Sequence, residues 1–141
     1  MIALKDILVV APMLVLLVAS LIPVMIKVFN SNREPAPFVT IAYSILGLVA
    51  AGFLTASMSG AKQTAFSDAL VLDGMGVWGT YLILGSAAFA MMMAYDHVDT
   101  FKRLFSEKCF LMMGSVIGML ILLLSNDLIV TFLGIETMSL C

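Results

Sequence analysis

Long apolar runs separated by short polar segments organise this sequence. Five runs are expected to form helices, at about residues 7–28, 38–58, 75–95, 109–124 and 128–141. A helix rises about 1.5 Å per residue, so a run of about 20 residues crosses the ~30 Å hydrocarbon core of a bilayer. The pattern predicts an all-α membrane protein, a single transmembrane domain over residues 1–141 with four complete transmembrane helices plus a truncated fifth.

The composition excludes a soluble fold. Hydrophobic residues make up 62% of the chain and charged residues only 11%, and the mean hydropathy is +1.15. Soluble domains are about half apolar and about a quarter charged. The formal net charge of −2 is too small to indicate a nucleic-acid partner. We therefore expect the lipid bilayer to surround this chain and no nucleic acid to bind it.

The fifth apolar run is shorter than a membrane span. Residues 128–141 would rise about 21 Å as a helix, roughly two thirds of the hydrocarbon thickness. We expect either that the chain is the N-terminal fragment of a longer subunit or that a second chain completes this helix.

The basic residues predict an orientation. The first and third loops hold most of them, namely Lys27, Arg33, Lys102, Arg103 and Lys108. The opposite side holds only Lys5 and Lys62. Because lysine and arginine accumulate in cytoplasmic loops, this bias places the N-terminus on the outer, periplasmic side.

Two glycine patterns point to packing. Gly74, Gly76 and Gly79 match the GxGxxG dinucleotide fingerprint letter for letter, but that motif needs a preceding strand within a βαβ unit. We interpret these glycines as a closely packed helix start, and expect no cofactor-binding residues. Gly114 and Gly118 form a GxxxG pattern, which favours close contact with a partner helix.

Other chemically active residue types have ordinary explanations. His97 is the only histidine and is interpreted as a solvated loop residue, with a proton relay as the less favoured alternative. Cys109, at the expected start of a helix, and Cys141 belong to no metal-spaced cluster. We expect no metal site.

The two acidic residues near the C-terminus differ in kind. Asp127 directly precedes the fifth run, where helix capping accounts for an acid. Glu136 follows nine residues later, about 13 Å into the membrane and close to its midplane. An acid there costs about 2.5 kcal/mol or more unless it has a partner, a water-filled cavity or a proton. We favour a proton or ion carrier over a neutral structural glutamate, because burial favours the protonated form that a reversible carrier must visit.

The residues around Glu136 resemble a known family. The stretch from Ser125 through Leu140, with its N-D-L and F-L-G-I-E-T-M-S-L strings, resembles the fifth helix of subunit N of respiratory NADH-quinone oxidoreductase (complex I). The V-L-D-G string ending at Gly74 resembles that family's V-D-G-F motif before the third helix. The whole chain is similar to the N-terminal part of this antiporter-like, proton-translocating subunit.

The resemblance implies a membrane-arm subunit that takes part in redox-coupled proton translocation. Glu136 would be the proton carrier and would pair with a lysine from a later helix of the subunit. No catalytic activity is expected from this chain alone, and NADH, FMN, iron–sulfur clusters and quinone are expected in other subunits. The implied partners are other complex I membrane subunits and the remainder of its own subunit, in an energy-transducing membrane, by preference the bacterial plasma membrane.

Two alternatives stay open on the residues alone. One is a fragment of a secondary cation/proton antiporter, in which Glu136 would be an ion ligand. The other is a structural membrane-bundle protein without transport activity.

Overall fold

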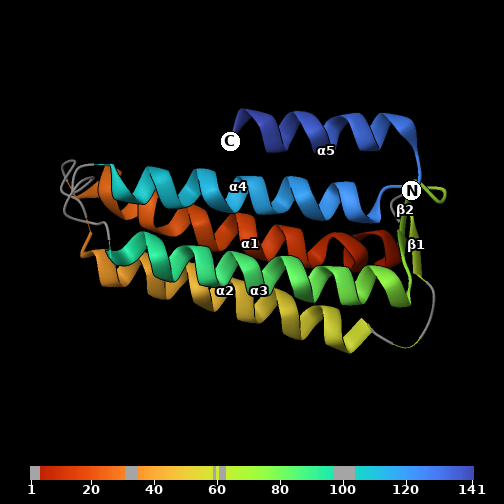
Figure 1. Cartoon of the computed structure of the whole chain (residues 1–141), viewed down its shortest axis with the longest axis horizontal. Helices are drawn as coiled ribbons and strands as arrows, with labels where there is room; N and C mark the ends of the chain where they lie inside the picture. The colour runs from red at the N-terminus through yellow and green to blue at the C-terminus, as the bar shows by residue number, and fades with distance from the viewer. Residues whose placement is uncertain (1–3, 31–34, 59, 61–62, 97–103) are drawn as a thin grey trace.

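A computed structural model describes residues 4–30, 35–58, 60, 63–96 and 104–141 of the chain. Its helices are α1 (Leu4–Phe29), α2 (Pro37–Met58), α3 (Gly74–Asp96), α4 (Phe105–Leu124) and α5 (Leu128–Leu140). The first four are long and apolar enough to cross a membrane, and α5 is a shorter apolar helix. This arrangement confirms the predicted fold class, a helical membrane bundle of four long helices and a shorter fifth (Figure 1).

The four long helices form one bundle, with α5 on its outside. Helix α1 packs against α2 and α4, while α3 packs against α2 and α4. Helix α5 runs along the outer side of α4 (Figure 1), and among the described elements α4 is its main packing partner. Fully buried apolar side chains fill the bundle interior, among them Leu16, Met91, Met113 and Leu120.

A short β-hairpin closes one end of the bundle. Strand β1 (Gln63–Ala65) pairs antiparallel with β2 (Leu70–Leu72), and Thr64 lies opposite Val71. The hairpin buries Ala65 and both ends of β2. Residues 59–73 lie between two of the predicted helices, and the sequence predicts no strand there, because strands of three residues carry too little alternation to be recognised.

Helix α4 begins four residues before the predicted start, at Phe105 rather than Cys109. Phe105 and Ser106 are buried, so packing rather than hydropathy decides where this helix begins. Cys109 consequently lies inside the helix, with only 2% of its surface exposed, and not at its start. The predicted loop residues Arg33, Lys62, His97, Lys102 and Arg103 lie outside the described residues.

Candidate functional site

Glu136 lies in the second half of α5, whose start is defined by a capping side chain. Asp127 has extended backbone angles, and its carboxylate oxygen Oδ1 accepts a hydrogen bond of 3.3 Å from the amide of Ile129. This contact confirms the capping role predicted for Asp127. Glu136 lies eight positions after Leu128, which is about 12 Å along the helix axis. The carboxylate is thereby held well inside an apolar segment.

Glycines let the backbones of α4 and α5 touch. A Cβ atom placed on Gly118 would lie 2.7 Å from the amide nitrogen of Met138 and 3.1 Å from the carbonyl oxygen of Gly134. A Cβ on Gly134 would lie 3.0 Å from the amide nitrogen of Leu122. A Cβ on Gly114 would approach the sulfur of Cys141 to 2.6 Å. The GxxxG prediction is confirmed, and α5 is the partner helix.

This interface determines the direction in which Glu136 points. Gly134 and Met138 face α4, and each residue of a helix is rotated by about 100° from the one before it. Glu136 is therefore about 200° around the helix from Gly134 and projects away from α4 and the bundle. Its side chain is exposed, and within the described part of the chain no hydrogen bond or ion pair to its carboxylate is recorded.

The surroundings of Glu136 on α5 are apolar. Phe132, Leu133, Ile135 and Leu140 are all more than half exposed, and they surround the carboxylate with hydrocarbon side chains. The nearby hydroxyl of Thr137 donates to the carbonyl oxygen of Leu133, 2.7 Å away. The exposed face of α5 thus presents one acid within a surface suited to lipid or to another apolar helix.

The structure brings together a charged pair that the sequence did not predict. Lys27, at the end of α1, donates a 2.8 Å hydrogen bond to Oε1 of Glu107 in the first turn of α4. The lysine side chain is 11% exposed and the glutamate side chain 42%. The sequence assigned Lys27 to the first loop and predicted no partner for it. Only the packing of α1 on α4 joins two residues 80 positions apart.

The GxGxxG glycines serve as a helix start, as predicted. The amide of Gly76 donates to Oδ1 of Asp73 at 2.7 Å, which caps α3. A Cβ on Gly79 would lie 2.8 Å from the methyl carbons of Leu123 on α4. These contacts are helix capping and close helix packing, so the pattern has a complete structural explanation.

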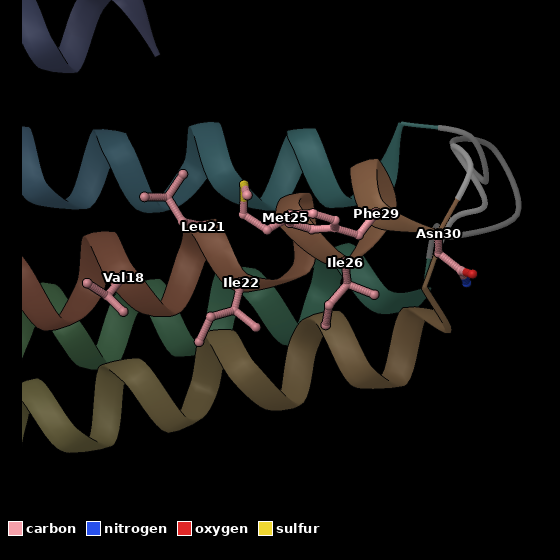
Figure 2. Close-up of a pocket in the computed structure, with 7 residues that line it drawn as sticks. All are labelled: Val18, Leu21, Ile22, Met25, Ile26, Phe29 and Asn30. Atoms are coloured by element: carbon pink, nitrogen blue, oxygen red, sulfur yellow. The ribbon is translucent and has the colours of Figure 1, made fainter.

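A groove of about 530 Å³ follows the second half of α1. Figure 2 shows the residues that line it, Val18, Leu21, Ile22, Met25, Ile26, Phe29 and Asn30. Asn30 is the only polar side chain among them, and none of them titrates. The groove therefore offers no acid–base chemistry.

Known proteins include relatives that match nearly the whole of this chain. No family model matches the chain. It is 41% identical over 139 residues to NADH-quinone oxidoreductase subunit N of Bdellovibrio bacteriovorus, covering 99% of this chain and 29% of that protein. It is 31% identical to the subunit N of Paramagnetospirillum magneticum, covering 99% of this chain and 28% of that protein.

A plastid protein is also similar. The NAD(P)H-quinone oxidoreductase subunit 2 of Mesostigma viride is 26% identical over 134 residues, covering 94% of this chain and 26% of that protein. The chain thus spans less than a third of the length of these curated relatives.

Proposed function

Because this chain is homologous over its whole length to the N-terminal part of NADH-quinone oxidoreductase subunit N, we propose that it works in the membrane arm of such an enzyme and takes part in redox-coupled proton translocation. Glu136 is the proton carrier in this proposal. The observation that supports it best is the position of this acid, well inside an apolar helix and directed away from the bundle that the described residues form.

The chemistry of the carrier follows from the cost of charge in hydrocarbon. An ionised carboxylate on the exposed face of α5 is strongly disfavoured unless a cation or water reaches it. A cation that approaches stabilises the ionised form, and its withdrawal favours uptake of a proton. Redox-driven movement of a neighbouring positive charge would therefore cause Glu136 to take up a proton and to release it again.

The cation belongs to the remainder of the subunit. The resemblance implies a lysine from a later helix, and the direction of Glu136 away from α4 leaves its carboxylate open to such a neighbour. The chain alone has no catalytic activity in this proposal. NADH, FMN, the iron–sulfur clusters and quinone bind to other subunits, which are also its partners in the membrane.

The proposed location is the plasma membrane of a bacterium, with the N-terminus on the periplasmic side. Bacterial relatives and the predominance of basic residues in the first and third loops support this assignment.

The test replaces Glu136 by Gln in the assembled enzyme. Gln keeps the size and polarity of the side chain but carries no titratable proton. We expect NADH oxidation to continue while the number of protons moved per NADH falls, measured in proteoliposomes with a pH-sensitive dye. Thr137→Ser is a matched control on the same helix, because it keeps the hydroxyl. Unchanged proton transport by Glu136→Gln would refute the carrier role and favour a structural bundle protein.

A cation/proton antiporter is the second candidate, because an intramembrane acid also suits an ion ligand. Copurification of the chain with an NADH-oxidising complex would exclude it. Transport of sodium by the chain's own subunit, without NADH, would favour it.

A further inference from the structure

The β-hairpin is bonded to the turn between α4 and α5. The backbone amide of Asn126 donates to the carbonyl oxygen of Ala69 at 2.9 Å. The side-chain Nδ2 of the same residue donates to the carbonyl oxygen of Asp68 at 3.1 Å. Leu70 and Ser125 form an antiparallel bridge beside them. One residue of the turn thus holds two consecutive carbonyl groups of the hairpin.

The other side of the hairpin is bonded to the start of α1. The amide of Phe66 donates to Oδ1 of Asp6 at 3.0 Å, and strand β1 packs against α1. Residues 63–72, with Asp6 and Asn126, therefore form a clasp between α1 and the α4–α5 turn. All these elements meet at the same end of the bundle (Figure 1).

The tip of the clasp has an unusual backbone. Phe66, Ser67 and Asp68 have φ angles of 53°, 56° and 68°, a left-handed conformation that residues with a Cβ rarely adopt in succession. Such a conformation persists where its surroundings hold it. Here Asp6 holds the amide that opens the tip, and Asn126 holds the two carbonyl groups that close it. The tip is therefore shaped by its two neighbours and transmits the position of one to the other.

Helix α5 depends on this connection more than the other helices do. Among the described elements its main packing is against α4, and its opposite face is exposed. The glycine contact with α4 holds the two backbones together along one face of α5, and the clasp adds a contact at the start of α5. This second contact limits how far α5 can tilt, and so helps to fix how deep Glu136 lies.

We propose that Asn126 is the positioning residue for Glu136: through the clasp it fixes the start of α5 relative to α1. The consequence for proton transport rests on the proposed function, whereas the position of α5 is measurable without it. Asn126 itself carries no proton and touches no reacting atom.

The structural test uses the complete chain in its membrane complex, with Cys109→Ala and Cys141→Ser so that no native thiol of this chain remains. Nitroxide labels on Phe89→Cys in α3 and Leu140→Cys in α5 report the distance between the two helices by pulsed electron paramagnetic resonance. Both native side chains are exposed. We expect one narrow distance for the unaltered clasp and a widened distribution for Asn126→Ala.

A matched control and a second variant at position 126 make this test decisive. Ser57→Ala also removes one exposed side-chain hydrogen bond to a carbonyl group, but at the end of α2, and should leave the distance narrow. Asn126→Asp keeps the side-chain shape and, like Asn126→Ala, the backbone contact, but it replaces the Nδ2 donor by an acceptor oxygen that the carbonyl oxygen of Asp68 repels, so it should widen the distribution at least as much as Asn126→Ala. A distribution unchanged by both substitutions at Asn126 would overturn the proposal.

The functional test separates the two proposals. Asn126→Ala should lower the number of protons moved per NADH, and should cause no further loss in an enzyme that already carries Glu136→Gln, because both act through the same carboxylate. A further loss on top of Glu136→Gln would show that Asn126 acts elsewhere. A widened distance together with normal transport by Glu136→Gln would retain the clasp and refute the carrier role of Glu136.

Discussion

The backbone contact between α4 and α5 at Gly118 allows a quantitative prediction. Replacing this glycine by alanine places a Cβ 2.7 Å from the amide nitrogen of Met138 and 3.1 Å from its Cα. Non-bonded heavy atoms prefer separations of about 3.5–4.0 Å. The contact atoms are backbone, so no side chain can rotate away. The helices must therefore separate locally by roughly 0.5–1 Å to relieve the contact.

Overpacking of this kind costs about 1–3 kcal/mol. Alanine also favours a helix over glycine by about 1 kcal/mol, which hides part of the loss. Gly85 on α3 provides the matched control, because a Cβ there meets nothing within 4 Å. Gly85→Ala gains the same propensity without the clash. The difference in free energy of unfolding between the two variants should therefore be about 1–3 kcal/mol.

The assay is equilibrium unfolding of the complete chain in mixed micelles of a mild detergent and sodium dodecyl sulfate, monitored by circular dichroism.

Gly134→Ala, on the facing helix, should be destabilising as well, because its Cβ would lie 3.0 Å from the amide of Leu122. Once the first alanine has separated the helices, the second meets less crowding. The double variant should therefore lose less free energy of unfolding than the sum of the two single variants. Equal stability of Gly118→Ala and Gly85→Ala would refute the backbone contact.

Three further predictions use the same unfolding measurement. Lys27→Met removes the partner of Oε1 of Glu107 and should lower the free energy of unfolding by about 1–2 kcal/mol, a moderate value because the glutamate is partly exposed. The double variant Lys27→Met with Glu107→Leu should recover part of that loss, because it leaves no unpaired charge. A double variant less stable than Lys27→Met alone would contradict this. Asp127→Ala should cost about 1 kcal/mol through loss of the cap on α5, while Asp127→Asn should be nearly neutral, and equal losses for both would argue against capping. Gly79→Ala should be tolerated better than a change against backbone, because the atoms nearest to its Cβ belong to the flexible side chain of Leu123. It should be tolerated better still beside Leu123→Ala.

Several features could be predicted from local sequence because their causes are local. The apolar runs determine the long helices, since a backbone inside a bilayer must satisfy its own hydrogen bonds. Asp127 was identified as a cap from its place before an apolar run, and the contact with Ile129 confirms it. The glycines of α4 indicated close packing, and the contact with α5 confirms that too.

Other features depend on pairs of residues that are distant in sequence. The clasp joins Asp6 to Phe66 and Asp68 to Asn126, across about 60 residues in each case. The local sequence around these residues indicates only a turn, because short strands and single polar residues show no repeating pattern of apolar and polar positions. The pairing of Lys27 with Glu107 was missed for the same reason.

The sequence by itself determined that this chain crosses a membrane several times and that one acid, Glu136, lies inside an apolar helix. Hydropathy and helix geometry are properties of consecutive residues, so no tertiary information was needed for either. The tertiary structure decided which way that acid points. Its direction depends on the side of α5 that α4 covers, and Gly118 and Gly134 set that side by allowing the two backbones to meet.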